Sequence, residues 1–302
     1  MRWVLFAELL MYAVLGGLLV SRAGWTPLQA TGLALASFLG LRLFIVLLTF
    51  SLMLTDSSAV PERLRIVPFR AMGMVLEEYA GLILLFTVIQ PFEAFWLEPD
   101  RLAKPQGGRL PLLLIHGYQC NRGFWFWLRP RLEAAGWTVA THNLEPVYAD
   151  IDHYAEGIAR RIDQVLAATG AAQLMLVGHS MGGLACRAYL RRDGRDKVAG
   201  LVTLGSPHHG SRLARLGLGP NARQMRIGSQ WLSALGAPGA VPLPQGSVSI
   251  YSCHDNYVVP QQAGSTLEGA ANVAIGGVSH IAMAFSPVVL AKLVEALALP
   301  SP

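Results

Sequence analysis

Charged side chains are scarce in this chain: they make up 14% of its 302 residues, whereas hydrophobic residues make up 53%. An average soluble domain has roughly 25% charged residues, so this composition indicates that part of the chain lies in lipid. The charges sum to +5, but the arginines are mostly isolated and form no cluster interleaved with aromatic residues. This pattern argues against a nucleic-acid partner, because phosphate binding needs a basic patch, and contact with an anionic membrane surface is the simpler explanation.

Cysteine is also rare. The chain has three cysteines, an odd number, and no two of them have C-x-x-C spacing: Cys120, Cys186 and Cys253. The sequence therefore predicts neither a disulfide framework nor a zinc site, although two of the three could still pair. We find no internal repeat and no low-complexity tract, and we expect no metal and no cofactor.

Charges nearly disappear from the first sixty residues, which hold only Arg2, Glu8, Arg22, Arg42 and Asp56. Two apolar runs in this region, residues 3–20 and 28–54, approach or exceed the roughly 20 residues that span a bilayer core, so both are predicted transmembrane helices. The first could instead be a cleaved signal peptide, but its apolar run is longer than the usual core of such a peptide.

A third apolar stretch runs from Met74 to Trp96 and has polar or acidic residues near both ends. We expect it to span the membrane, with an amphipathic anchor in the interface as the alternative. Glu8 and Arg42 have opposite signs on the first two predicted helices. They are expected either to pair within the hydrocarbon or, equally, to snorkel or face the rest of the protein.

From residue 110 onward, short apolar runs alternate with helical patterns. Several runs are almost wholly apolar, as in a parallel sheet covered on both faces. The predicted strands are residues 112–115, 138–143, 173–177, 198–204, 247–252 and 272–275, and the predicted helices are residues 151–169, 181–192 and 287–298. This alternation predicts a doubly wound α/β domain with a mostly parallel sheet of about six strands, preceded by two or three transmembrane helices.

Residues 178–182 read GHSMG and stand between an apolar strand pattern and an apolar helical pattern. This order is what a nucleophile elbow requires, because glycines two before and two after the serine permit the strained turn that exposes its hydroxyl. Ser180 is therefore the candidate nucleophile. The alternative is a glycine-rich turn that carries an incidental serine.

A serine hydroxyl is a weak nucleophile at neutral pH, so an acid and then a histidine are expected further along the chain. Asp255 follows the predicted strand 247–252, and His280 follows the last predicted strand. We expect His280 to be the general base and Asp255 to hold its tautomer and stabilise the imidazolium. A solvated loop carboxylate and a surface histidine are the alternatives.

The oxyanion that develops in acyl transfer needs donors already aimed at it, and beside a nucleophile elbow these are backbone N–H groups. One is expected from Met181, directly after the nucleophile. The other is expected from Tyr118, since residues 116–118 read HGY at the end of a buried run.

Several segments together resemble the bacterial lipase and esterase branch of the α/β-hydrolase superfamily: HGY at 116–118, GHSMGG at 178–183, TLGSPHHG at 203–210, and the surroundings of Asp255 and His280. In order, they extend over nearly all of residues 110–285. Because the sheet starts directly at residue 112, there is no room for the two opening strands of larger hydrolases. A minimal α/β-hydrolase is expected.

The resemblance implies hydrolysis of carboxylic esters through an acyl-enzyme, with acyl glycerols or fatty-acid esters as substrates. It puts Ser180, Asp255 and His280 on the catalytic triad, and Met181 and Tyr118 on the oxyanion hole. His208 and His209 match a loop motif of the family, which we interpret as shaping the loop rather than taking part in chemistry.

The expected organisation has three parts: membrane-anchoring helices over residues 1–97, a linker over 98–109 and a catalytic domain over 110–302. Within the domain, residues 213–244 are long enough to form a lid with a short helix around 230–235. Residues 124–128 read FWFWL, which suits an acyl pocket, a membrane interface or ordinary core packing.

The sequence thus predicts a multi-pass membrane protein that hydrolyses lipid or acyl-glycerol esters. An acyltransferase or thioesterase with the same triad is the alternative within enzymes, and a catalytically silent membrane scaffold is the alternative outside them. With three spans and the N-terminus inside, the arginines near residue 65 are cytoplasmic and the catalytic domain is extracytoplasmic. If the third helix lies in the interface instead, the catalytic domain is cytoplasmic.

Overall fold

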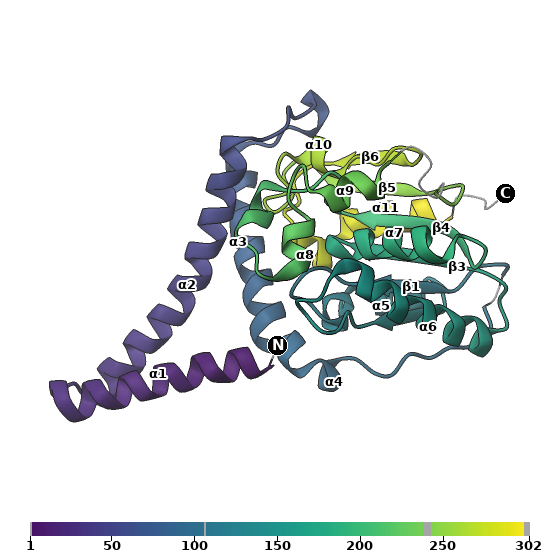
Figure 1. The fold of residues 1–302 in the computed structure, drawn as a ribbon. Coiled ribbons are helices and arrows are strands. Elements are labelled where there is room, and N and C mark those ends of the chain that lie inside the picture. Colours follow the sequence, from purple (N-terminus) through teal and green to yellow (C-terminus); the bar gives the residue numbers. More distant parts are fainter. Residues whose placement is uncertain (1, 106, 238–242, 299–302) are drawn as a thin grey trace.

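The computed structural model describes residues 2–105, 107–237 and 243–298. A sheet with helices on both faces forms the body of the molecule, and two long helices project from it as a hairpin (Figure 1).

In the described part of the chain the sheet has six strands, which are β1 (Leu112–Ile115), β2 (Val139–His142), β3 (Leu174–His179), β4 (Val198–Leu204), β5 (Val248–Ser252) and β6 (Ala271–Ile275). They lie in the order β2-β1-β3-β4-β5-β6, and every pairing is parallel. The central strands are buried along their whole length, as expected for a parallel sheet between helical layers. The predicted doubly wound fold is confirmed, and each predicted strand agrees with the structure to within two residues.

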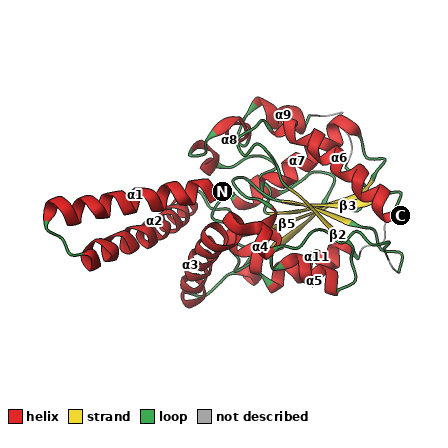
Figure 2. Ribbon diagram, turned by 90° about the horizontal axis from the view of Figure 1, so that it is seen from below, coloured by secondary structure: helices red, strands yellow, loops and turns green. Residues whose placement is uncertain are grey.

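Helices cover the two faces of the sheet (Figure 2). One layer contains α5 (Leu128–Ala134) and α11 (Pro287–Leu297), and the other contains α6 (Ile151–Thr169), α7 (Met181–Asp193) and α9 (Gln230–Leu235). In α6 the buried side chains recur at helical spacing, as at Ile158, Ile162 and Val165, so one stripe faces the core. The three predicted helices agree with the structure to within one residue.

The first two helices, α1 (Arg2–Ala23) and α2 (Pro27–Thr55), form the projecting hairpin. Thr26 and Gln29 form a capping box at the start of α2. The connection between α1 and α2 is therefore short. Most apolar side chains of both helices are exposed, and both helices are long and apolar enough to cross a membrane.

Glu8 on α1 and Arg42 on α2 form a forked ion pair, in which Arg42 Nη2 lies 2.6 Å from Glu8 Oε2. Their side chains are only 16% and 12% exposed. The hypothesis that these two charges pair is confirmed, and the pair joins the two arms of the hairpin.

The third apolar stretch is a continuous but irregular helix over residues 68–96. It comprises α3 (Pro68–Ile83), a π-helical turn η2 (Leu84–Ile89), η3 (Gln90–Phe92) and α4 (Glu93–Trp96). It is long and apolar enough to cross a membrane, but 33% of its most apolar stretch is buried inside the protein. Leu82, Leu85 and Ile89 belong to the same hydrophobic cluster as the sheet, so this helix is part of the body.

Asp100, between this helix and β1, is bound to the body. Asp100 accepts hydrogen bonds from Thr141 N at 2.7 Å and Thr141 Oγ1 at 3.0 Å, and its carboxylate pairs with Arg129 and Arg161. The division of the chain at residues 97 and 109 stays a prediction.

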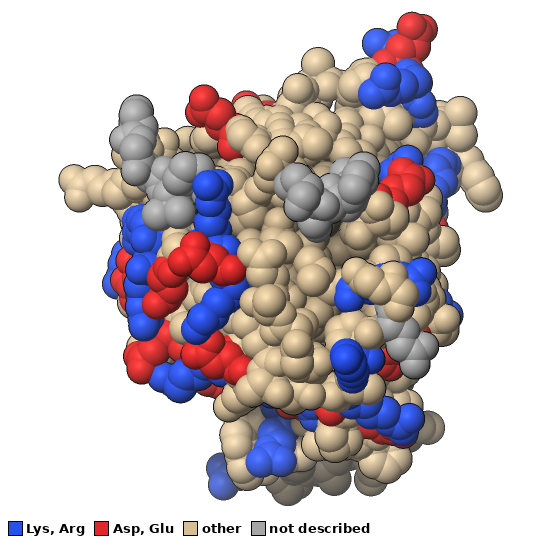
Figure 3. Space-filling model, turned by 90° about the vertical axis from the view of Figure 1, so that its right-hand side faces the viewer, with Lys and Arg blue, Asp and Glu red and all other residues tan. Residues whose placement is uncertain are grey.

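The remaining short helices are η1 (Glu62–Leu64), η4 (Arg122–Trp125), η5 (Arg212–Arg215), α8 (Gly219–Gln224), α10 (Gln261–Ser265) and η6 (Ile281–Phe285). On the face of the body turned away from the hairpin, basic and acidic side chains are interspersed (Figure 3). The surface of the hairpin is instead mainly apolar, in agreement with the scarcity of charged residues in the first part of the sequence.

Candidate active site

The turn between β3 and α7 presents Ser180 at the carboxyl edge of the sheet, and the backbone of Ser180 is strained, with φ 53° and ψ −126°. The glycines on either side allow this turn because the backbone crosses itself closely. A Cβ on Gly178 would lie 2.5 Å from Gly183 N, and a Cβ on Gly182 would collide with the carbonyl of Ile115. The strand, turn and helix form a nucleophile elbow.

Asp255 and His280, which are far from Ser180 in sequence, come together on neighbouring loops after β5 and β6. Asp255 Oδ2 lies 2.8 Å from His280 Nδ1. The other oxygen, Oδ1, accepts hydrogen bonds from the N–H groups of Tyr257 and Val258, each at 2.8 Å. Asp255 is 1% exposed, so one carboxylate oxygen is fixed by the backbone and the other faces the imidazole away from solvent.

The charge state of His280 follows from its surroundings. Burial lowers its pKa, but attraction to the Asp255 carboxylate and their hydrogen bond, with a smaller contribution from Glu78, outweigh burial and raise the pKa above the ordinary 6.5. The Tyr257 ring stacks on the imidazole at 5.1 Å. Asp255 and Tyr257 thus fix the orientation of His280, and its raised pKa suits the predicted role of general base.

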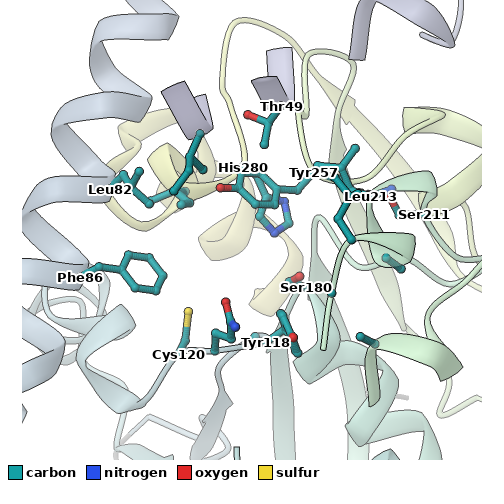
Figure 4. Close-up of a pocket in the computed structure, with 18 of the residues that line it drawn as sticks. Thr49, Leu82, Phe86, Tyr118, Cys120, Ser180, Ser211, Leu213, Tyr257 and His280 are labelled. Carbon is teal, nitrogen blue, oxygen red and sulfur yellow. Dashed lines mark hydrogen bonds between the residues drawn. The ribbon is translucent and has the colours of Figure 1, made fainter. Parts of the chain in front are cut away.

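Ser180 and His280 both line one large cavity of about 600 Å³. Figure 4 shows the imidazole of His280 over the Ser180 side chain, with Tyr118 beside the serine. The structure thus brings together Ser180, His280 and Tyr118 around one space, with Asp255 behind the histidine.

The two predicted oxyanion donors lie next to this space. Met181 begins α7 directly after Ser180, and Tyr118 lies in the loop after β1. Within the described residues, neither backbone N–H donates to another protein group. The loop is pressed against the elbow, because a Cβ on Gly117 would lie 2.8 Å from Ser180 Cβ.

His116 holds that loop in place. Its Nε2 accepts the N–H of Leu144 at 2.9 Å, so Nδ1 carries the proton and donates to the carbonyl of Gly117. Burial lowers the pKa of His116 to about 4. A neutral histidine therefore joins the loops after β1 and β2.

His208, in the segment 203–210, makes structural contacts. His208 is buried, and its Nε2 lies 2.9 Å from Thr203 Oγ1, at the start of a hydrogen-bond chain through Ser249 to the carbonyl of Ser265. Burial lowers the pKa of His208 well below the usual value, so it is neutral. This geometry agrees with the interpretation of residues 203–210 as a loop-shaping segment.

The aromatic segment 124–128 is mainly core. Phe124, Trp125 and Leu128 are at most 1% exposed, and Phe126 and Trp127 pack against the same cluster. Phe124 also borders the cavity and stacks on His179 with ring centroids 4.0 Å apart. Core packing thus accounts for most of the segment.

The predicted lid region contains η5, α8 and α9, and the predicted short helix is found at Gln230–Leu235. Its first part, residues 213–225, borders the cavity. Tyr118 Oη donates to the carbonyl of Leu218 and accepts its N–H, each at 2.8 Å, which holds this part over the oxyanion loop. Residues 238–242 of the predicted lid lie outside the described part of the chain.

Three polar residues of the N-terminal helices hold the loops that carry His280 and Tyr118, and sequence reasoning missed them. Thr49 Oγ1 on α2 accepts from Asn256 Nδ2 at 2.8 Å, and Asn256 Oδ1 accepts the N–H of His280 at 3.0 Å. Glu78 on α3 is fully buried, and its carboxylate accepts the N–H groups of Ile281 and Ala282, directly after His280.

The third residue is Gln90 on η3, whose side-chain oxygen accepts the N–H of Asn121 at 2.8 Å and whose carbonyl accepts from the Asn121 amide. This contact holds the loop after β1 three residues beyond Tyr118. Glu78 had one signal in the sequence, since a carboxylate within an apolar helix is expected to have a specific role. Thr49 and Gln90 had none, because polar residues of this kind are common in such helices.

Comparison with known proteins agrees with this geometry. A sequence model of the family described as alpha/beta hydrolase fold matches residues 111–223. The chain is 35% identical over 114 residues to a triacylglycerol lipase of Pseudarthrobacter phenanthrenivorans and 35% identical over 114 residues to one of Burkholderia plantarii. The match covers 35% of this chain and 35% and 32% of those proteins, so the chain spans about a third of the curated relatives it matches.

Solved structures give the same fold. Lipase B of Aspergillus fumigatus superposes with a TM-score of 0.58 and 22% identity, covering 65% of this chain and 54% of that one. The mature lipase BlEst2 of Bacillus licheniformis superposes with a TM-score of 0.57 and 17% identity, covering 66% of this chain and 96% of that one. The chain has the α/β-hydrolase fold, and the predicted resemblance to the lipase and esterase branch is confirmed.

Proposed function

We propose that this α/β-hydrolase-fold chain is a serine hydrolase that cleaves carboxylic esters of lipids at a membrane. The observation that carries the proposal is the Asp255–His280 pair beside the strained Ser180, with Ser180 and His280 lining one mainly apolar cavity. The triacylglycerol lipases that it resembles support lipid esters as the substrate class.

In the first half-reaction, Ser180 Oγ attacks the ester carbonyl carbon while His280 Nε2 takes the hydroxyl proton. The carbonyl oxygen becomes an oxyanion, which the N–H groups of Met181 and Tyr118 stabilise. When the tetrahedral intermediate collapses, the bond to the alcohol oxygen breaks and the alcohol leaves with the proton from His280. The acyl group remains on Ser180.

In the second half-reaction, His280 takes a proton from water, and the resulting hydroxide attacks the acyl-enzyme. Collapse returns the proton to Ser180 Oγ and releases the carboxylic acid. Asp255 keeps its charge throughout and stabilises the imidazolium that forms in each half.

The N-terminal helices supply the membrane part of the proposal. Three helices in the described residues are long and apolar enough to cross a bilayer. We propose a multi-pass protein whose catalytic body lies on the extracytoplasmic side. Protease protection in sealed vesicles tests this, since a cytoplasmic body would be digested only from the cytoplasmic face.

Acyl transfer to another acceptor and thioester hydrolysis use the same constellation and are the alternatives within enzymes. Product analysis separates them, because hydrolysis releases free fatty acid from an oxygen ester without an added acceptor.

The proposed nucleophile is tested with a fluorophosphonate probe on the detergent-solubilised full chain. We expect the probe to label the wild type at Ser180, as located by peptide mass spectrometry. The Ser180→Ala variant should not label and should lose ester hydrolysis, whereas Ser233→Ala, a change at an exposed serine on α9, should behave as the wild type. A folded wild type that neither labels nor hydrolyses any ester would favour the silent scaffold.

A further inference from the structure

We propose that the membrane helices α2 and α3, with the π turn η2, form the wall that binds the acyl chain, so that they select long acyl esters drawn from the bilayer. This inference rests on the proposed function and names the substrate class of the same site. In it, the helices are part of the active site as well as an anchor.

The first evidence is the lining of the cavity. Besides the catalytic residues, one side is formed by Leu41, Ile45 and Leu48 of α2 and by Leu82, Leu85 and Phe86 of α3 and η2. Figure 4 shows Leu82 and Phe86 turned towards the space that Ser180 and His280 border. A cavity of about 600 Å³ with mainly apolar walls and a few convergent polar groups is typical of a small-molecule site.

The second evidence is the continuity of this wall with the lipid-facing surface. Leu41, Ile45 and Leu48 line the cavity and are still 46%, 36% and 36% exposed. The neighbouring Phe44 and Leu47 are 61% and 48% exposed and do not line it. The apolar surface of α2 therefore extends from the outside of the hairpin to the cavity. Because a long acyl chain remains against apolar groups along this path, it can enter without exposure to water.

The third evidence is charge. Glu8 and Arg42 are the two charged residues from the hairpin that border the cavity, and they bind each other. Their opposite charges compensate, so this side presents no net charge to an acyl chain. A net charge there would instead favour an ionic substrate group.

The fourth evidence is the set of hydrogen bonds between these helices and the catalytic loops. Thr49 holds Asn256, Glu78 holds the backbone after His280, and Gln90 holds the loop after Tyr118. These bonds connect the wall to the residues around Ser180. The wall is therefore at a defined position relative to the nucleophile. A fixed distance between the two is needed if the site is to discriminate between acyl chains of different length.

The test compares two adjacent residues of α2. Leu48→Trp places a bulky ring in the cavity, and Leu47→Trp places the same ring on the outer surface as the matched control. The kcat/KM of each detergent-solubilised full-length variant is measured on nitrophenyl butyrate, octanoate and palmitate. Fluorophosphonate titration of Ser180 normalises each preparation to its active fraction.

We expect Leu48→Trp to lower the palmitate-to-butyrate ratio of kcat/KM by at least about tenfold, while Leu47→Trp keeps the wild-type ratio. Phe86→Ala removes bulk from the same wall and enlarges the cavity, so it should raise the palmitate-to-butyrate ratio. Unchanged ratios in both Leu48→Trp and Phe86→Ala would overturn the acyl wall while leaving the hydrolase in place. Absence of labelling and of hydrolysis in the wild type would instead overturn the proposed function.

Discussion

At the scale of single residues, the site depends on groups whose protonation the fold sets. His116 and His208 are buried, and burial lowers the pKa of each, so both are neutral. His280 alone among these three faces a buried carboxylate, which raises its pKa. Burial without a charged partner gives a structural histidine, and burial beside Asp255 gives a candidate base.

This difference predicts the pH dependence of ester hydrolysis. Protonated His280 cannot accept the serine proton, so kcat/KM should rise as pH increases through the pKa of His280 and then level off. Because that pKa is raised, the midpoint should lie above the ordinary 6.5. A profile of kcat/KM from about pH 5 to about pH 9 measures it, and a midpoint well below 6.5 would contradict the assignment of His280.

At the scale of elements, α3 contacts the loop that carries His280 through a buried carboxylate. The Glu78 carboxylate accepts two N–H groups at the start of η6 and contributes to the raised pKa of His280. A carboxylate at the first turn of a helix also suits the direction of its backbone dipoles. Glu78 is thus a positioning residue that acts through His280.

We therefore expect Glu78→Gln to move the midpoint of the pH profile to lower pH, because the change removes a negative charge that raises the pKa of His280. It should also lower kcat, since the amide is a weaker acceptor for the η6 N–H groups. Glu77→Gln is the matched control, as Glu77 is exposed and pairs with Arg70. A purely structural role would reduce the labelled fraction without moving the midpoint, and that result would count against a role through His280.

At the scale of the whole molecule, polar contacts as well as apolar packing join the two helices of the hairpin to each other and the hairpin to the body. The Glu8–Arg42 pair joins α1 to α2, and Thr49 joins α2 to the loop that carries Asp255. Both are shielded from water, so their loss leaves unpaired polar groups in an apolar setting.

Charge reversal tests the first of these contacts. Glu8→Arg or Arg42→Glu alone should destabilise the detergent-solubilised protein by about 3 to 5 kcal/mol, the usual cost of breaking a buried pair. The double reversal should restore most of the loss, as measured by thermal unfolding of the full chain. If the double variant is no more stable than the single ones, the pair does not join the helices in solution.

Much of the fold could be predicted from the sequence because its signals are local. The apolar runs of the strands, the periodicity of α6 and α11, and the glycines around Ser180 each depend on a few adjacent residues. The candidate triad could be predicted because the order of its members along the chain is restricted in this fold. The roles of Ser180, Asp255, His280, Met181 and Tyr118 stay predictions that the experiments above test.

The third apolar stretch shows where local signals end. Its composition is suited to a membrane span, yet Leu82, Leu85 and Ile89 complete the core of the sheet. Hydropathy does not distinguish lipid from a protein interior, because both are apolar. The packing of one side of residues 68–96 against the body could therefore not be predicted from hydropathy.

The sequence by itself determined the α/β fold, the order of its elements and the candidate catalytic side chains, since short-range patterns encode all three. The tertiary structure alone decided what surrounds those side chains. Thr49 and Asn256 are 207 residues apart, and Glu78 lies 204 residues before Ala282. Contacts of this kind depend on how distant segments pack, and no pattern of neighbouring residues records that the apolar N-terminal helices form one wall of the cavity.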